Sequence, residues 1–534
     1  MGASVFGNVM LYVRTIARMK PSMILARLRC TRKVPNGLPS RTICSMGLAI
    51  KTLDCDRNYA SRFKVDGLDS NSFSILNEQH IVDLSEWSVS EASHLWNFNL
   101  HYFEYCVPLA ARYTESHNRD DLDQFKRLVL TWIMSCKYPH GDAWHPYTIS
   151  LRLINWLVCL DLFGDALTED AVFMDLFEKS MYRQYRHLLA NQEKHLLANH
   201  YFENLKTLVI CALLFGEDDV FAEVERDLLA QLDEQILADG VHYERSMMYH
   251  KLVLEGLLRV TLAYRASGKQ VPDKVLFKAK QMLDAMASIE RGMGKTPFFN
   301  DSADGVAKEC DALVDACRNV LGYEADSSKT SFPESGFYKL YDGDASLVFF
   351  AGEPGPRYML GHAHCDLLSF ELSVAGEPVI INSGTYAYQS EFRPYFRSTA
   401  AHNTCQIDGS EQMECWGEHR VARGVRDVRV FLFGGDSIKA AYTDYRGISY
   451  ERELLLTDGK LSVIDKAPGA SASNLVSYLH LLSGRGFQLT TTFEHMQKKS
   501  EERIYSRAFG IAERCTVFSC SGLSHGVGYT FKWN

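Results

Sequence analysis

The chain has 534 residues, of which 46% are hydrophobic, 12% aromatic and 23% charged. This is enough for two or three domains with substantial cores, and it excludes a disordered or low-complexity protein. The formal net charge of -9 argues against general nucleic-acid binding, so we expect no nucleic-acid partner. The 14 cysteines are scattered, with no CxxC pair, and several, such as Cys159 and Cys211, sit in apolar helical runs. That pattern favours reduced thiols in a cytoplasmic protein.

Residues 1–92 are predicted to form a helical or irregular first segment. Its apolar run, Val9 to Val13, is short, and the positive charges follow the run instead of preceding it, so a secretory signal peptide is not expected. The segment reads as a basic, partly amphipathic helix that either packs on the domain or lies on an anionic membrane surface. We therefore expect a cytoplasmic or peripherally membrane-associated protein, with the periplasm as an alternative. The basic residues are Arg14, Arg18, Lys20, Arg27, Arg29, Arg32 and Lys33.

Helical periodicity dominates the next part, which we place at residues 93–330. Apolar positions recur at helical spacing in Leu122-Phe125-Leu128-Val129-Trp132 and again in Leu228-Leu229-Leu232-Ile236-Leu237. The character changes after Ser335. Short apolar runs punctuated by glycine then predict a β-sandwich over residues 335–534, with strands at 345–350, 368–374, 379–381 and 428–433.

The segment Gly361-His362-Ala363-His364-Cys365-Asp366 holds two histidines two residues apart in a stretch that reads as a strand. Alternation would send both imidazoles to the same face. A second strand-like run, 377–388, leads to His402, which we expect to converge on that face. The pattern by itself fits either a metal or catalytic site or a hydrogen-bonded polar patch.

The helical part contains several segments that mix aromatic and hydrogen-bonding side chains. Clefts that bind sugars need this mixture, because pyranose faces stack on aromatic rings while hydroxyls and carboxylates take directional polar partners. The segments are Leu95 to Phe103, Trp144 to Trp156, Leu197 to Asn204 and Tyr243 to His250.

In content and order, these segments resemble the heparinase II/III family of polysaccharide lyases and related alginate lyases. The likeness runs from about Leu95 to Arg423 and is most specific in the GHAHxDxLSF and AHNT segments. The resemblance implies an α+β multidomain fold, in which an N-terminal (α/α) incomplete toroid precedes an antiparallel β-sandwich. It also implies an enzyme, a carbon-oxygen lyase that cleaves a uronate-containing acidic polysaccharide by β-elimination.

That chemistry requires the uronate carboxylate to be neutralised, the C5 proton to be removed and the departing O4 oxygen to be protonated. Asn199 and His200 match the family's neutralising position. Tyr249 matches its catalytic tyrosine, with Tyr243 as a competing candidate. His362 matches a second base or carboxylate-contacting histidine, supplied by the β-domain, so each domain alone would lack a complete site.

His364 and His402 match positions that hold a structural zinc ion in several relatives. The third ligand should be an aspartate, but Asn382 stands in its place. A neutral amide is a poor zinc ligand, so no cofactor is required and a structural zinc is left open. Without metal, His364, Asn382 and His402 would brace His362.

Further residues of these segments are interpreted as lining the cleft or, equally, as holding the helices together. They are Asn99, His101, Tyr102, Trp144, Tyr147, Arg152, Trp156 and Glu244. Because the chain is acidic, local cations would have to attract an acidic glycan. The candidates are Arg152, Arg245, Arg393 and Arg397, of which Arg397 could bind a sulfate or carboxylate or merely pair with an acidic neighbour.

The alternative to a lyase is a non-catalytic glycan-binding or assembly protein of a cell-surface polysaccharide pathway. The Asn382 change and the lack of a signal peptide favour that alternative, whereas the set Asn199, His200, Tyr249 and His362 favours the enzyme. A third interpretation, a metal-dependent hydrolase or oxygenase built on the HxH pair, lacks an evident carboxylate ligand.

Overall fold

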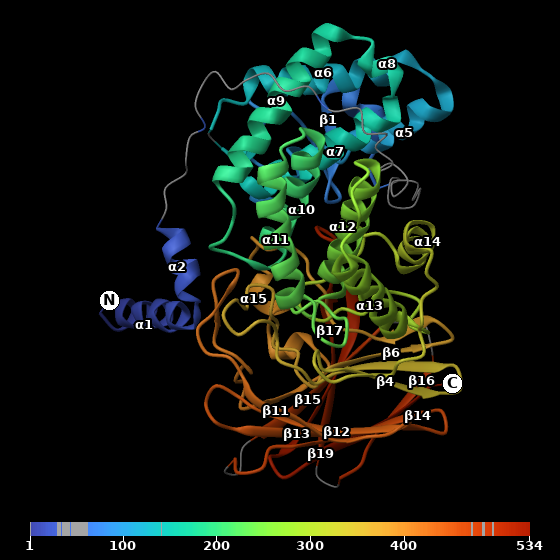
Figure 1. Ribbon diagram of the computed structural model, residues 1–534. Helices are drawn as coiled ribbons and strands as arrows, with labels where there is room; N and C mark the ends of the chain where they lie inside the picture. Colours follow the sequence, from blue (N-terminus) through green and yellow to red (C-terminus); the bar gives the residue numbers. More distant parts are fainter. Residues whose placement is uncertain are drawn as a thin grey trace.

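The computed structural model describes residues 2–28, 34, 43, 62–139, 141–470, 474–482, 486–493 and 496–533. Arg29, Arg32 and Lys33 of the basic segment lie outside these residues. The chain folds into a helical part followed by antiparallel sheets, the expected α+β arrangement of an incomplete toroid and a β-sandwich (Figure 1). The change from helices to strands falls between Leu321 and Ser331. In the described parts of the chain, no helix is long and apolar enough to cross a membrane.

The first described elements precede the toroid. Two helices lie at the left of the molecule in Figure 1, and a short helical turn and a hairpin follow them in the sequence. These elements are α1 (Gly2–Arg18), α2 (Pro21–Arg27), η2 (Val65–Ser70), β1 (Ser72–Ile75) and β2 (Glu78–Ile81).

The toroid helices begin where side chains cap their free N–H groups. Ser93, Asn118, Asp170 and Ser246 each accept a hydrogen bond from a backbone N–H in the first turn of the helix that follows. The helical elements are α4 (His94–Leu100), α5 (Cys106–Ser116), α6 (Arg119–Ser135), η3 (Asp142–Trp144), α7 (Pro146–Phe163), α8 (Asp165–Thr168), α9 (Ala171–Ala190), α10 (Ala198–Leu214), α11 (Asp218–Gln235), α12 (Met247–Ala266), α13 (Asp273–Glu290) and α14 (Cys310–Leu321).

The predicted helical repeats form the core of the toroid. All five apolar residues of the first repeat are buried in α6. In the second repeat, Leu228 and Leu232 are buried in α11, but that helix ends at Gln235, so Ile236 and Leu237 lie beyond it. α7, α10 and α12 are buried along most of their length, because other helices pack around them.

Two antiparallel sheets form the sandwich. In the larger sheet the strand order is β17-β18-β15-β7-β6-β5-β4-β3, with β8 paired to β15, and in the smaller sheet it is β11-β12-β13-β14-β19-β16. The strands are β3 (Ser331–Phe332), β4 (Phe337–Asp342), β5 (Ala345–Phe350), β6 (Phe370–Val374), β7 (Glu377–Ile380), β8 (Cys405–Ile407), β11 (Arg426–Phe433), β12 (Ser437–Thr443), β13 (Ser449–Thr457), β14 (Lys460–Lys466), β15 (Asn474–Leu481), β16 (Phe487–Thr491), β17 (Gln497–Tyr505), β18 (Glu513–Leu523) and β19 (Val527–Trp533). A separate hairpin joins β9 (Cys415–Trp416) and β10 (Arg420–Val421), and two short turns of helix, α15 (Arg393–Phe396) and η4 (Thr399–Ala401), precede β8.

Four of the predicted strands are present, with small shifts at their ends, but two other strand predictions were wrong. Residues 361–366, which hold the HxH pair, form a loop, and the run 377–388 is a strand only as far as Ile380. The loop is held by irregular partners: the N–H of Asp301 donates to the His362 carbonyl at 3.0 Å, and the N–H of Cys365 donates to the Arg397 carbonyl at 3.0 Å. Because its backbone groups are satisfied by other loops, no strand forms there.

The toroid and the larger sheet share an apolar cluster that fixes one against the other. Met247 and Ile289 from the helical side pack with Phe337, Val348 and Phe350 from β4 and β5. All five are buried, so the two parts meet through a dry core. This contact fixes the start of α12, whose first residue is Met247, against the larger sheet.

Candidate active site

A cavity of about 390 Å³ lies between the toroid and the sandwich. Its toroid side comes from α4, α7, α10 and α12, and its sandwich side comes from loops that carry Gly361, His362, Tyr388, Gln389, His419 and Phe509. The cavity is therefore completed only when both parts of the fold are present. Of the residues predicted from the sequence, Asn199, His200, Tyr249, His362, Asn99, Tyr102, Tyr147 and Glu244 line it.

Asn199 and His200 are brought to the cavity by the first turn of α10. The two preceding residues, Leu197 and Ala198, have φ angles of 58° and 53°, a left-handed conformation that is costly for side chains other than glycine. The amide nitrogen of Asn199 donates to Glu244 Oε2 at 3.0 Å and lies 3.4 Å from His362 Nε2. The Asn199 carbonyl oxygen is buried and has no partner in the described structure, so the side chain is not fully satisfied by the protein.

His200 is held by a buried carboxylate. Its Nδ1 lies 2.9 Å from Oε1 of Glu193, and the other oxygen of that carboxylate, Oε2, accepts from Asn204 Nδ2 at 3.0 Å. Burial would lower the pKa of His200, but the Glu193 carboxylate, helped by Glu244 and Glu203, raises it above its usual value. Burial would likewise raise the pKa of Glu193, yet His200 and His145 lower it to about 2. The ion pair with Glu193 therefore favours the protonated form of the His200 imidazole.

Tyr249 lies in the first turn of α12, below the capping side chain of Ser246. Ser246 Oγ accepts from the Tyr249 N–H at 3.4 Å and donates to the Asp301 carbonyl at 2.6 Å, which fixes the helix start against that loop. The Tyr249 hydroxyl lies 2.7 Å from the Tyr388 hydroxyl, and its ring centroid is 4.3 Å from that of His362. Burial, with Tyr388 and Asp301 nearby, raises the pKa of Tyr249 well above its usual value. Tyr249 is therefore a neutral phenol that can donate a proton.

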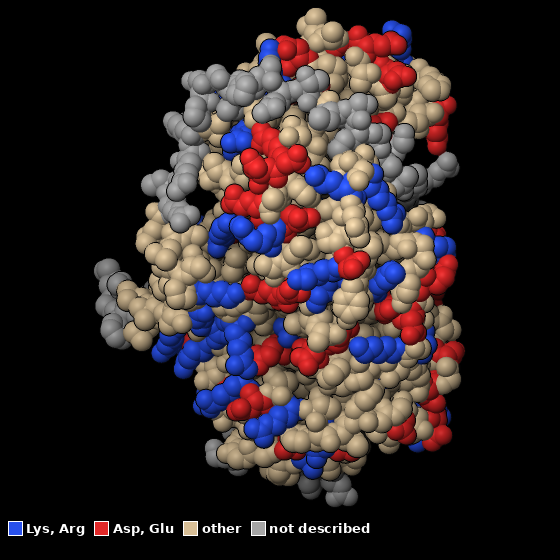
Figure 2. All heavy atoms as spheres, in the orientation of Figure 1, with Lys and Arg blue, Asp and Glu red and all other residues tan. Residues whose placement is uncertain are grey.

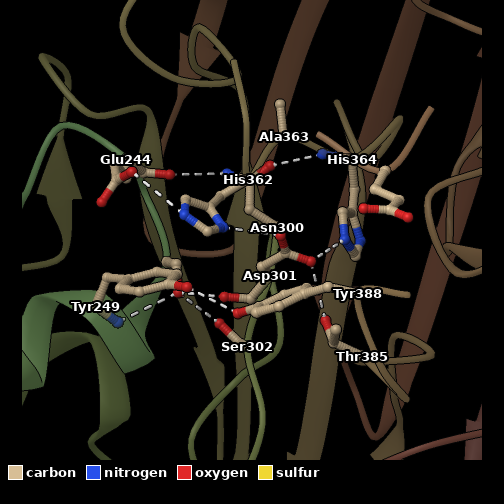
Figure 3. A network of polar contacts seen from close by, with 12 residues as sticks. Glu244, Tyr249, Asn300, Asp301, Ser302, His362, Ala363, His364, Thr385 and Tyr388 are labelled. Carbon is tan, nitrogen blue, oxygen red and sulfur yellow. Dashed lines mark hydrogen bonds and ion pairs between the residues drawn. The ribbon is translucent and has the colours of Figure 1, made fainter. Parts of the chain in front are cut away.

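Asp301 is the centre of the polar network below the cavity, as Figure 3 shows. Its Oδ2 accepts from His362 Nδ1 at 2.9 Å and its Oδ1 accepts from His364 Nε2 at 2.8 Å, so the HxH histidines meet one carboxylate. The guanidinium of Arg393 donates to both oxygens. Although burial opposes ionisation, Arg393 and the two histidines hold the pKa of Asp301 well below its usual range. With its proton on Nδ1, held by Asp301, the imidazole of His362 presents Nε2 as an acceptor on the cavity side, where the Asn199 amide nitrogen lies 3.4 Å away.

The zinc site implied by the resemblance is not matched by the donor atoms. His364 and His402 are buried with ring centroids 5.3 Å apart, and Nδ1 of each has no partner in the described structure. Asn382, however, uses its Oδ1 to accept from Ser369 Oγ at 2.6 Å and from the Asn403 N–H at 3.2 Å. Its unpartnered atom is therefore the amide nitrogen, which has no lone pair to offer a metal. Two imidazoles and an NH₂ group do not make a zinc site.

A second group of donor atoms lies at the cavity wall. In the described structure, ligand atoms of Asp301, His362 and His419 lie within 4.8 Å of one another. Both oxygens of Asp301 are already bound to Arg393, whose positive charge disfavours a cation at this point. The cluster is better suited to orienting His362 than to holding a metal.

Five residues predicted to contact the substrate do not line the cavity: His101, Trp144, Arg152, Trp156 and Arg397. Arg152 is fully buried and donates to Gln184 and to the carbonyls of His101 and Ala143, so it ties helices together. Arg397 donates to the carbonyls of Ala363, Gly417 and Glu418 and supports the HxH loop from behind. The scaffolding interpretation applies to these side chains.

The arginines expected to attract an acidic glycan all form hydrogen bonds or ion pairs within the protein. Arg245 donates to the carbonyls of Tyr243, Glu334 and Ser335, and Arg393 is bound to Asp301. With Arg152 and Arg397, these side chains are at most 6% exposed. A guanidinium that far from solvent cannot meet a polymer, so the basic side chains that line the cavity are its histidines and Arg62, beside the carboxylates of Glu104, Glu203 and Glu244.

The sequence did not reveal five residues of the site, namely Glu193, His145, Asp301, Tyr388 and His419. Asp301 lies in the segment Phe299-Asn300-Asp301-Ser302, which the sequence suggests as a loop returning to the cleft, although it assigns Asp301 no role of its own. Tyr388 lies in an aromatic run close to the HxH segment. His419 had no local signal, because the residues around it are distant in the sequence. Glu193 lies only seven residues before its partner His200, but it stands just outside the segment Leu197 to Asn204 that the sequence singled out.

Comparison with known protein families shows which family has this architecture. Models described as "Heparinase II/III N-terminus" and "Heparinase II/III-like, C-terminal" match residues 58–326 and 324–518. The chain belongs to the heparinase II/III family. The family membership predicted from the HxH and AHNT segments is thereby confirmed.

Two curated proteins are similar in sequence. The heparin-sulfate lyase of Pedobacter heparinus is 21% identical over 397 residues, covering 68% of this chain and 57% of that protein. The FtsZ-localized protein C of Caulobacter vibrioides is 24% identical over 336 residues, covering 62% and 55%. The match thus spans little more than half the length of either relative.

Solved heparinase structures share the fold. A heparinase III structure matches with a TM-score of 0.70 at 14% identity, covering 96% of this chain and 88% of that one. The heparan sulfate lyase from Pedobacter heparinus matches with a TM-score of 0.58 at 16% identity, covering 98% and 87%. At these identities the likeness establishes the toroid and sandwich of the heparinase II/III fold, and the activity must be argued from the site.

Proposed function

We propose that this heparinase II/III protein is a polysaccharide lyase that cleaves a uronate-containing glycan by β-elimination. The observation that carries the proposal is the convergence of Asn199, His200 and Tyr249 from the toroid with His362 from the sandwich on one cavity. The named activities of the relatives, a heparin-sulfate lyase and a heparan sulfate lyase, support the same reaction class.

Asn199 and His200 would hold the uronate carboxylate. The imidazole of His200, whose protonated form Glu193 favours, offers a charge-assisted hydrogen bond, and the Asn199 amide exchanges its contact with Glu244 for one with the substrate. Neutralising the carboxylate lowers the barrier for removal of the C5 proton, because charge then moves into an enolate-like group that these donors stabilise.

His362 and Tyr249 would move the two protons. Nε2 of His362 has the lone pair to accept the C5 proton, and Asp301 stabilises the imidazolium that results. The electron pair forms the C4–C5 double bond and the C4–O4 bond breaks. The neutral phenol of Tyr249 then gives its proton to O4, and its hydrogen bond with Tyr388 stabilises the phenolate that remains.

The cavity favours carboxylated over heavily sulfated glycans. Among its described lining residues Arg62 is the one lysine or arginine, and this side chain donates to Glu104 at 2.7 Å. Sulfate groups are recognised mainly by arginine and lysine, whereas a carboxylate fits the imidazole and amide donors present here. We therefore propose an unsulfated uronate polymer as the substrate class.

The test combines product formation with isotope exchange. Wild-type protein is incubated with unsulfated and sulfated uronate polymers, and the ultraviolet absorbance of the unsaturated uronate product is followed. In heavy water, Tyr249→Phe should lose cleavage but still exchange the C5 hydrogen for deuterium, whereas His362→Gln should lose both. Absence of cleavage on every polymer, with binding retained, would overturn the lyase proposal.

The alternative, a non-catalytic glycan-binding protein, has one structural observation in its favour. Glu244 holds the Asn199 amide in the cavity, so a carboxylate lies close to where an acidic substrate would bind. Glu244→Gln distinguishes the two: a lyase should bind its substrate more tightly and keep the tyrosine-dependent cleavage, whereas a binding protein changes only in affinity.

A further inference from the structure

The outer face of α1 carries a stripe of apolar side chains that is open to solvent. Val9, Tyr12, Val13 and Ile16 recur at spacings of three and four residues and are each about half exposed, between 49% and 52%. Residues at that spacing share one face of a helix. Half-exposed apolar residues are ordinary when scattered, but four on one face form a contiguous patch.

The opposite face of α1 is fastened to the sandwich by polar contacts. Thr15 accepts from Trp416 Nε1 at 3.0 Å, Arg14 donates to Glu414 at 3.0 Å, and Arg18 donates to the Arg357 carbonyl at 3.1 Å. The helix is therefore held in one rotation about its axis: Val9, Val13 and Ile16 face outward, while Tyr12, at the edge of the stripe, packs its ring 4.6 Å from that of Trp416 and stays half exposed. An amphipathic helix that served only to pack on the body would turn its apolar side inward instead.

Arginines surround the helix on the body of the protein. Figure 2 shows Lys and Arg side chains gathered beside α1, at the lower left of the molecule. Arg18, Arg357 and Arg426 line one shallow depression. Arg420 lies 5.6 Å from the centre of the Tyr12 ring, so a cation borders the stripe itself.

The arginines beside α1 form a basic group that outnumbers the carboxylates paired with it. Its members are Arg14, Arg18, Arg357, Arg420, Arg423 and Arg426. Glu414 pairs with both Arg14 and Arg423, and Glu353 pairs with Arg357. Asp427 lies 3.8 Å from Arg426, with both side chains more than half exposed, which makes a weak contact. This positive region stands out on a chain whose formal net charge is -9.

We propose that α1 and this basic group dock the protein on the surface of an anionic lipid bilayer. An apolar helical stripe bordered by arginines suits the boundary between headgroups and acyl chains, where the stripe leaves water and the cations meet lipid phosphates. A protein partner would require an acidic and apolar surface that matches this face in shape, and nothing on the helix defines such a shape. A fluid bilayer adapts to the face, so binding to it requires only the apolar stripe and the positive charge.

The docking face is linked to the cavity by the β9–β10 hairpin. Trp416 of this hairpin contacts α1, and His419, three residues later, lines the cavity. Arg393 and Arg397 donate to the backbone of Glu418 between them. Docking would therefore hold the cavity in a fixed orientation close to the membrane surface, whichever glycan the cavity takes.

The test is co-sedimentation of the full-length protein with vesicles of phosphatidylcholine alone and with phosphatidylglycerol added. We expect binding that needs phosphatidylglycerol and falls as salt is raised. Val13→Glu with Ile16→Glu should reduce the partition coefficient at least tenfold. Arg420→Glu should reduce it at least about fivefold, the factor expected for losing one cation at an anionic surface.

A matched control uses exposed apolar residues elsewhere. Val172 and Met134, on α9 and α6, are 76% and 82% exposed, and Val172→Glu with Met134→Glu should leave vesicle binding unchanged. The proposal is overturned if wild-type protein does not sediment with anionic vesicles, or if the control variant loses as much binding. It is also overturned if light scattering shows that the stripe instead joins two copies of the chain, with dimers lost in Val13→Glu/Ile16→Glu and no vesicle binding. Glycan cleavage is a separate readout, so failure of either proposal leaves the other intact.

Discussion

At the scale of single residues, the site is defined by how each titratable group is paired. Glu193 favours the protonated form of His200, burial keeps Tyr249 neutral, and Asp301 orients His362. The proposed roles of acid, base and carboxylate holder thus rest on neighbours as much as on residue type.

The pairing of His200 with Glu193 predicts a specific pH dependence. Because Glu193 raises the pKa of His200, the charge of His200 is present below that pKa and is lost as the pH rises through it. Glu193→Gln removes the raising influence, so the alkaline fall in kcat/KM should move to lower pH. Glu217→Gln alters a carboxylate that holds Tyr182 and Tyr185 away from the cavity and should leave the profile unchanged. An unshifted profile in Glu193→Gln would rule out this role.

The amide at position 382 predicts that zinc binding can be gained. Asn382→Asp would supply the missing carboxylate between His364 and His402, whose Nδ1 atoms have no partner in the described structure. We expect the variant to retain about one zinc ion per chain after dialysis, as measured by elemental analysis, and the wild type to retain none. Adding His402→Ala should abolish the gain. Equal zinc in wild type and variant would contradict the donor-set argument.

At the scale of elements, the site depends on loops that fill the joint between toroid and sandwich. The loop after α13 passes so close to the β6–β7 turn that a Cβ on Gly294, at φ +67°, would lie 1.6 Å from the Gly376 carbonyl oxygen. Only glycine allows this approach, and the approach sets where the following loop, with Asp301, meets the HxH segment.

Gly294→Ala therefore should destabilise the protein more than an ordinary glycine replacement. Gly305, at φ +75°, has a similar backbone but open space around its Cβ position, so Gly305→Ala isolates the cost of the backbone conformation alone. We expect Gly294→Ala to lower the free energy of unfolding by about 1 to 3 kcal/mol more than Gly305→Ala, measured by chemical denaturation. Equal losses of unfolding free energy in the two variants would mean that the loop can move to make room for the added Cβ.

At the scale of the whole molecule, Asp301 links the two parts, because it lies on the loop that follows the toroid's α13 and binds His362, His364 and Arg393 of the sandwich. Asp301→Asn should destabilise the protein by about 3 to 5 kcal/mol at neutral pH, since it leaves the guanidinium of Arg393 buried without its counter-charge. Asp304→Asn, on the same loop, breaks the more exposed pair with Arg507 and should cost less.

The difference in stability between wild type and Asp301→Asn should depend on pH, and the sign of this dependence is defined. The pKa of Asp301 is depressed in the folded state, so its contribution to stability is present above the unfolded carboxyl pKa and is lost as the pH falls through the folded value. The gap between wild type and Asp301→Asn should therefore shrink in acid. A gap that stays constant down to the lowest pH at which the wild type is folded would contradict the assigned ionisation.

The sequence by itself determined the family, the change from helix to sheet, and the residues whose chemistry is carried by local motifs. Four site residues were identified because each lies in a short segment whose neighbouring residues match the family's motifs. They are Asn199, His200, Tyr249 and His362. Helical periodicity and strand runs are also local, so most elements could be predicted with small shifts at their ends.

Only the tertiary structure decided which polar residues face the cavity. Arg152, Trp156 and Arg397 occur in the same kinds of segment as residues of the site, yet they are buried as scaffold, because the packing of neighbouring helices and loops turns them away. The strand predicted at the HxH pair is absent for the same reason. A loop that contacts another loop brings both histidines to Asp301, and they are 61 and 63 positions from Asp301 in the sequence. Such contacts depend on the assembled fold and leave no periodic trace in the sequence.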